Sequence, residues 1–94
     1  MFSLVLVLIG IRGNAQDIHI RGFVEDLESG EKLPAVHIQN IQTSHGTTTN
    51  ESGYYSLAVP VTSGTLIVSY IGYKTDTISW SATSDTVVHV QMRN

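Results

Sequence analysis

The sequence predicts an all-β protein, a sandwich of seven short strands. Val, Ile and Thr make up nearly a third of residues 16–94, and these β-branched side chains pack well on the half-buried surface of a pleated sheet. No segment places apolar residues at helical spacing, and turn-forming residues recur about every ten positions, as in sandwiches and barrels. We therefore expect strands along this whole part of the chain.

Residues 1–15 are set apart because they match a secretory signal peptide. The apolar run from Leu4 to Ile11 is well short of the roughly 20 residues that a membrane-spanning helix needs. Gly13 and Ala15 place small residues before a cleavage after Ala15, so the exported domain would comprise residues 16–94. Residues 1–3 lack the usual positive charge, which predicts a true start upstream. The alternative is a buried apolar strand.

The first strand is expected from Ile18 to Glu25, with alternating aliphatic and polar or aromatic residues. Its predicted core face consists of Ile18, Ile20, Gly22 and Val24. A charged loop, Asp26 to Lys32, follows, and Pro34 fixes the backbone before a second strand from Ala35 to Ile41. In this second strand Val36 and Ile38 should face inward.

The middle of the chain predicts a hairpin. Thr47 to Thr49 forms a short strand, and Asn50-Glu51-Ser52-Gly53 has Asn and Gly where a type I turn favours them. The return strand runs from Tyr54 to Val59 and ends at Pro60, which lacks a backbone N–H donor.

Three more strands complete the set. Thr65 to Tyr70 is the most apolar and is expected at the centre of a sheet, before a bend at Ile71-Gly72-Tyr73. Thr75 to Trp80 and Thr86 to Met92 follow, the latter with Val88, Val90 and Met92 inward and His89 and Gln91 outward.

The charge balance argues against nucleic-acid binding, and the lack of cysteine argues against two kinds of structural cross-link. Only Arg12 of the five Lys and Arg residues precedes residue 16, which leaves four scattered cations against eight acidic side chains. Nucleic-acid binding needs clustered positive charge and is not expected. Because the chain has no cysteine, neither a disulfide framework nor a thiolate zinc site can form.

We expect no catalytic, cofactor-binding or metal-binding residues. No two of the four histidines stand at metal-ligand spacing, and the acidic loop lacks the pattern of a calcium-binding loop. No Gly-x-Ser-x-Gly motif or glycine-rich phosphate loop is present. The histidines are His19, His37, His45 and His89, and the loop acids are Asp26, Glu28 and Glu31. The aromatic residues, expected mainly in the core and corners, are Tyr54, Tyr55, Tyr70, Tyr73 and Trp80.

Three segments in order resemble the carboxypeptidase regulatory-like domain family: IRGFVEDLESGEKLPAVHIQN from Ile20, GTTTNESGYYSLAVP from Gly46 and TLIVSYIGYKT from Thr65. The resemblance implies a seven-stranded, immunoglobulin- or transthyretin-like sandwich without catalytic activity. Two residues depart from the family pattern, namely Asn50 where Asp is usual and Ala35 where Gly is common. Asn can preserve the turn because its side chain also caps backbone groups.

The form SYIGYKT behind a signal peptide ending in Ala-Gln is most similar to the N-terminal domain of TonB-dependent outer-membrane receptors. That resemblance implies a periplasmic interaction or spacer domain. Its partners would be the plug and barrel of a longer chain or other periplasmic and outer-membrane proteins. The chain stops at Asn94, which predicts a fragment or a free-standing domain. Two alternatives remain: an accessory domain of an exported zinc carboxypeptidase, and a carbohydrate-binding domain that uses the Tyr and Trp residues.

Overall fold

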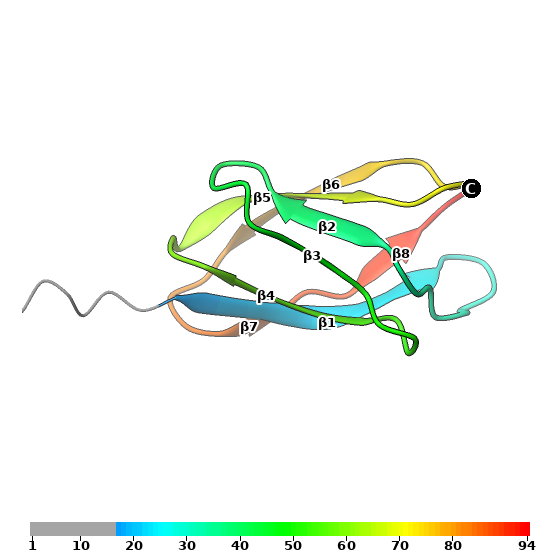
Figure 1. Ribbon diagram of the computed structural model, residues 1–94, viewed down its shortest axis with the longest axis horizontal. Coiled ribbons are helices and arrows are strands. Elements are labelled where there is room, and N and C mark those ends of the chain that lie inside the picture. Colours follow the sequence, from blue (N-terminus) through cyan, green and yellow to red (C-terminus); the bar gives the residue numbers. More distant parts are fainter. Residues whose placement is uncertain (1–16) are drawn as a thin grey trace, which may run out of the picture.

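The computed structural model describes residues 17–94, and the predicted signal peptide lies outside them. These residues form eight strands in two sheets that face one another across a single core (Figure 1). The strands are β1 (Ile18–Asp26), β2 (His37–Asn40), β3 (Gly46–Thr48), β4 (Tyr54–Val59), β5 (Ser63–Ser69), β6 (Asp76–Ser81), β7 (Thr86–Val87) and β8 (Val90–Met92). The predicted all-β sandwich is confirmed.

The first sheet is built around β1. Strand β4 pairs with it antiparallel along one side, while β7 and β8 pair with it parallel along the other. The second sheet has the order β3-β2-β5-β6, in which all neighbours are antiparallel. The predicted central position of the apolar strand is therefore confirmed, because β5 lies between β2 and β6.

The alternating patterns of the sequence correspond to the two faces of each sheet. Alternate residues of β1 are buried up to Val24, as predicted, and the same holds for β2 and β4. Apolar residues from every strand except β3 and β7, together with Leu33 and Val36, meet in the core. Tyr55, Ile20, Ile38, Leu66 and Met92 are the largest fully buried side chains. Within residues 17–94, these side chains form one hydrophobic core.

The predicted hairpin around Asn50 is wrong. The β-turn itself forms, since the Gly53 N–H donates to the Asn50 carbonyl at 2.9 Å and Gly53 has a φ of +77°. However, β3 pairs with β2 and β4 pairs with β1, so the turn connects two different sheets. The cause is Thr49, whose buried hydroxyl donates to the Leu33 carbonyl and accepts from the Val36 N–H at 2.9 Å, holding this segment beside the start of β2.

The predicted last strand is divided into β7 and β8. Between them, the backbone of Val88 approaches Gly22 of β1 so closely that a side chain at position 22 would collide with the Val88 carbonyl. Only glycine fits beside this irregular segment. The predicted inward positions of Val90 and Met92 are confirmed, and Val88 is half-buried.

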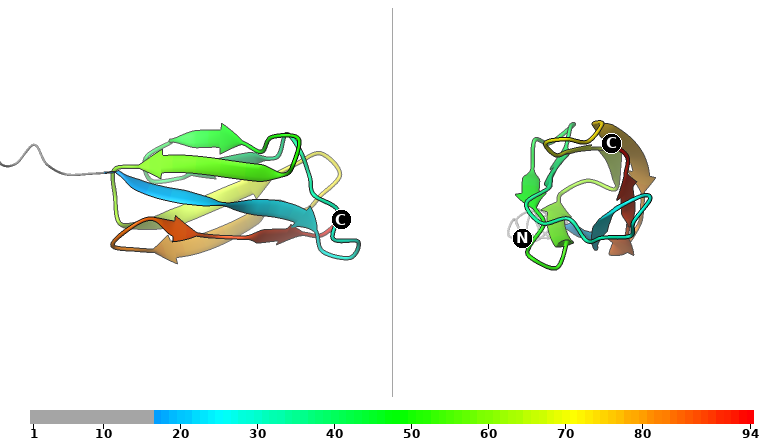
Figure 2. Two further views of the ribbon diagram at one scale, coloured as in Figure 1. Left: turned by 90° about the horizontal axis from the view of Figure 1, so that it is seen from below. Right: turned by 90° about the vertical axis from the view of Figure 1, so that its right-hand side faces the viewer.

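The two ends of the described chain lie at opposite ends of the sandwich (Figure 2). Strand β1 starts at one end, and the chain finishes at Asn94 at the other, beside the β5–β6 connection. The Lys74 N–H donates to the Arg93 carbonyl at 2.8 Å and joins these two segments. The described part of the chain contains no helix that could span a membrane.

Candidate functional site

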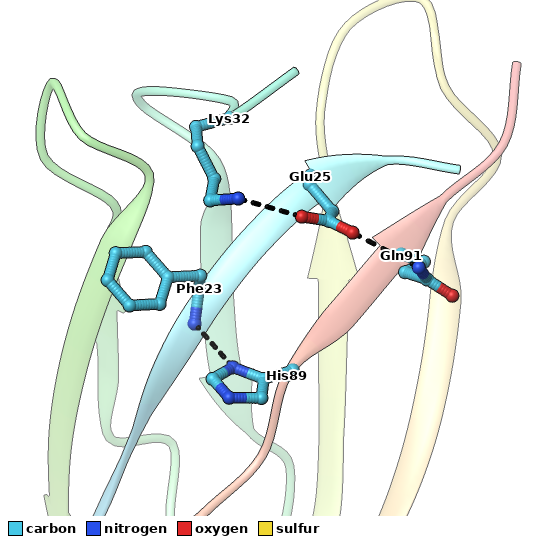
Figure 3. A pocket seen from close by; sticks show the side chains of 5 residues that line it. All are labelled: Phe23, Glu25, Lys32, His89 and Gln91. Atoms are coloured by element: carbon cyan, nitrogen blue, oxygen red, sulfur yellow. Dashed lines mark hydrogen bonds and ion pairs between the residues drawn. The ribbon is translucent and has the colours of Figure 1, made fainter. Parts of the chain in front are cut away.

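A cluster of polar and aromatic side chains lies on the outer face of the first sheet (Figure 3). Phe23 and Glu25 come from β1, Gln91 comes from β8, His89 precedes β8, and Lys32 reaches over from the loop after β1. They line an open hollow of about 450 Å³. We call these five residues the outer-face cluster.

Glu25 joins the polar members of this cluster. Its carboxylate accepts from Lys32 Nζ at 2.9 Å and from Gln91 Nε2 at 3.1 Å. The hydrogen bond from Lys32 is the main reason that the pKa of Glu25 lies below its usual value, and the bond from Gln91 lowers the pKa further. Both carboxylate oxygens are thus engaged within the cluster.

Phe23 is surrounded by complementary groups. The Tyr54 ring meets it edge-on at a centroid distance of 5.5 Å, and the His89 ring stacks on it at 6.0 Å. Lys32 Nζ lies 5.7 Å from the Phe23 centroid, within reach of a cation–π attraction. The partly exposed ring therefore has neighbours from three other parts of the chain.

His89 has a structural role that the sequence did not reveal. Its Nδ1 accepts the Phe23 N–H at 3.1 Å, next to the position where the Val88 N–H donates to the Arg21 carbonyl. The imidazole thus replaces a strand carbonyl where β7 and β8 are interrupted. This bond requires Nδ1 to be free of a proton. No sequence signal marks the role, because the partner is 66 residues away.

The other histidines lie apart. His19 lies near Asp85, with 3.4 Å between Nδ1 and Oδ1, and the His19 N–H donates to the same carboxylate oxygen. This backbone bond is the largest cause of the lowered pKa of Asp85. His37 is in β2 and His45 precedes β3. Within residues 17–94, no three His, Asp or Glu side chains gather in a way that could hold a metal ion.

In the acidic loop, Asp26 binds groups of the protein itself. Its carboxylate accepts from the Glu28 and Ser29 N–H groups at 2.8 and 2.9 Å, and from the Tyr73 hydroxyl at 2.8 Å. The Ser29 N–H is the main cause of the lowered pKa of Asp26, and the bond to Asp26 raises the pKa of Tyr73. The loop is thereby tied to the corner after β5.

The aromatic residues do not gather on one exposed face. Trp80 is 7% exposed and donates its Nε1–H to Asn40 Oδ1 at 2.9 Å. Tyr55 is buried, donates to the Val88 carbonyl at 2.6 Å, and has a raised pKa because of its burial. Tyr70 and Tyr73 stack on each other at the corner after β5. The aromatic platform required by the carbohydrate-binding alternative is therefore not formed by Trp80.

A second surface feature lies at the end of the sandwich where the chain finishes. Ile71, at the tip of the turn closed by the Tyr73 N–H and the Tyr70 carbonyl, is 94% exposed. It adjoins an open, mainly apolar hollow that is also lined by Tyr70 and Ala35. Ala35 has a φ of 62°, which explains why glycine suits this position.

Two sequence comparisons identify relatives of this chain. The model of the CarboxypepD_reg-like domain family matches residues 20–94. The TonB-dependent receptor P3 of Formosa agariphila is 34% identical over 87 residues, which cover 93% of this chain but only 9% of the receptor.

Solved structures support the fold. Chains in two crystal structures of mutant type II cohesin–X-dockerin complexes from Acetivibrio cellulolyticus superpose with TM-scores of 0.67 and 0.68. The identities are 14% and 16%, and each match covers 80% of this chain and 56% of the other. This similarity concerns the sandwich alone. From the family match and the receptor relative, the chain belongs to the carboxypeptidase regulatory-like domain family.

Proposed function

We propose that the chain is the periplasmic N-terminal domain of a TonB-dependent outer-membrane receptor and acts there as a non-catalytic interaction and spacer module. The observation that carries this proposal is the similarity to a receptor over 93% of the chain, although the match spans only 9% of the receptor. A small domain that corresponds to so little of a long receptor is best explained as an appended module. Transport itself would belong to the remainder of the receptor.

The position of the two chain ends supports a spacer role. Because the described chain starts at one end of the sandwich and finishes at the other, the N-terminal end left by removal of the signal would lie a full sandwich length away from the segment that continues into the receptor (Figure 2). The core between the sheets is filled by side chains, which suits a rigid connecting unit. Residues 1–15 would act as the export signal.

The exposed corner at Ile71 would provide the interaction part of this role. Ile71 and Tyr70 belong to the β5–β6 connection, and the Lys74 N–H of the same connection donates to the carbonyl of Arg93, the residue after β8. The next receptor domain would therefore emerge beside this apolar surface. Contiguous apolar surface marks contact sites more reliably than a single side chain, and Ile71 shares its hollow with Tyr70 and Ala35.

Location and polypeptide size test this proposal. An antibody raised against residues 17–94 should detect a polypeptide far longer than 94 residues in the outer-membrane fraction of the source cells. The epitope should resist protease in intact cells and be digested once the outer membrane is permeabilised. A cytoplasmic signal, or an exported product no longer than this domain, would contradict the receptor assignment.

A direct assay tests the non-catalytic part. Purified residues 16–94 should not turn over peptide, ester or glycoside substrates above a buffer blank. Turnover that is lost when Glu25 or His89 is replaced by alanine would assign chemistry to the outer-face cluster and overturn this part of the proposal.

A further inference from the structure

Strand β6 forms an open edge of the second sheet. It pairs with β5 on one side, and within residues 17–94 no strand pairs with its other side. The edge strand β4 of the first sheet differs, because both backbone groups of Tyr54 are already bound by Asn50. In addition, the segment containing β3 runs alongside β4 (Figure 1). Of these two edges, β6 is the more open to an added extended chain.

The hydrogen-bond pattern identifies the backbone groups on this edge. The Ile41 N–H donates to the Thr65 carbonyl at 2.9 Å, so the backbone groups of Thr65 point toward β2. The backbone groups of the next residue, Leu66, therefore point toward β6. Leu66 is opposite Ile78, and the Ala82 N–H donates to the Thr62 carbonyl at 2.9 Å. Even-numbered residues of β6 thus bond to β5. The N–H and C=O groups of Thr77, Ser79 and Ser81 point away from β5, toward the open side of the strand.

The edge has little protection against pairing. Thr77, Ser79 and Ser81 carry small, uncharged and exposed side chains, and no Pro, Lys or Arg lies between positions 76 and 81. Natural edge strands normally use Pro and charged residues, especially Lys, to prevent association. The protection seen within residues 17–94 lies at the start of β6, where Asp76 is charged and exposed and its Oδ1 accepts from the Thr77 N–H at 2.9 Å. The N–H groups of Ser79 and Ser81 have no side-chain partner among the described residues.

We propose that β6 pairs antiparallel with β6 of a second copy of this chain, with a two-fold axis at Ser79. In this register the two Ser79 residues exchange N–H···O=C bonds. Each Ser81 N–H donates to the Thr77 carbonyl of the second copy, a bond that does not disturb the contact between Asp76 and the Thr77 N–H. The second sheets of the two copies become one continuous sheet.

Side-chain complementarity favours this register. Ile78 lies opposite Trp80 of the second copy on the core side, and only hydroxyl side chains meet on the outer side. Asp76 falls opposite Ala82, beyond the paired residues, so no charges oppose each other. A shift by two residues toward the start of β6 would place Asp76 opposite Trp80 and leave Ser81 opposite Thr75. A single strand pair buries little area, which predicts a weak dimer with a Kd on the order of 100 µM.

Sedimentation equilibrium on residues 16–94 tests the proposal, because this segment contains every strand and core residue described above. The average mass should rise from monomer toward dimer as the concentration passes the Kd. Ser79→Lys and Ser79→Glu should each remain monomeric, because like charges would oppose each other at the axis. An equimolar mixture of the two variants should dimerise again. Ser56→Lys, an equivalent change on β4, should leave the dimer unchanged.

Hydrogen exchange on the unmodified protein provides a test that needs no variant. Protection of the Ser79 and Ser81 amides should increase with concentration, while that of the Ser56 amide should not. A monomer at millimolar concentration would overturn the proposal. So would a dimer that survives Ser79→Lys, a mixture of variants that stays monomeric, or amide protection at Ser79 that does not vary with concentration. These outcomes do not depend on whether the chain belongs to a receptor.

Discussion

Two buried polar residues beside the core, Asn40 of β2 and Thr49 after β3, form hydrogen bonds similar to those of the outer-face cluster, which is at the surface. Asn40 is fully buried and accepts from the Trp80 indole, and Thr49 is bound on both sides by backbone groups. The bond between Glu25 and Lys32 is at the surface, where water can replace either partner. Hydrogen bonds of similar geometry therefore contribute unequally to stability, because only the buried groups are left without partners when a bond is removed.

The largest effect is expected for Asn40→Leu. This change removes the acceptor of the buried Trp80 Nε1–H, and it should lower the free energy of unfolding by about 3 kcal/mol. Urea denaturation followed by Trp80 fluorescence measures it. Gln39→Leu, a neighbouring amide on the exposed face of β2, is the matched control and should change stability little. Equal losses in the two variants would contradict the assigned weight of the buried bond.

Thr49→Val should cost about 2 kcal/mol. The replacement keeps the shape of the side chain but leaves the Leu33 carbonyl and the Val36 N–H without their hydroxyl partner. Thr48→Val, the exposed neighbour, should be nearly neutral in the same urea titration. If Thr49→Val were also neutral, the hydroxyl would not be what holds this segment against β2.

A relief of strain is expected at Ala35. Glycine adopts a φ of 62° without steric cost, and the exposed Ala35 side chain contributes little packing, so Ala35→Gly should raise the free energy of unfolding by about 0.5 kcal/mol. The matched change Ala58→Gly in β4, where the backbone is extended, should instead destabilise. A loss of stability with Ala35→Gly would show that the turn does not strain this residue.

The smallest effect concerns pH and the surface carboxylates. The pKa values of Glu25 and Asp26 are lowered in the folded state from ordinary values of 4.5 and 3.8. Their contribution to stability is therefore fully present above about pH 5 and is lost as the pH falls through the folded-state values. The urea midpoint should decline gently below about pH 4.5, and Asp26→Asn should flatten this decline. Parallel curves for the two proteins would exclude Asp26 as a source of the pH dependence.

The sequence by itself determined features that depend on neighbouring residues. Alternation from Ile18 to Val24 correctly predicted the buried face of β1, and the residues around Asn50 predicted a turn closed by Gly53. The expectation that glycine suits position 35 agrees with the observed φ of Ala35. Such patterns reflect the pleat of a strand and the torsion angles of a turn, which short segments encode directly.

Only the tertiary structure decided which segments meet. It placed β3 in the opposite sheet from β4, divided the last strand beside Gly22, and left β6 at an open edge of the part of the chain that the structure describes. It also brought Trp80 to Asn40, 40 residues away, and His89 to the Phe23 N–H. These outcomes depend on how two sheets close over a shared core. Because many pairings satisfy the same local alternation, the packing of the whole domain selects among them.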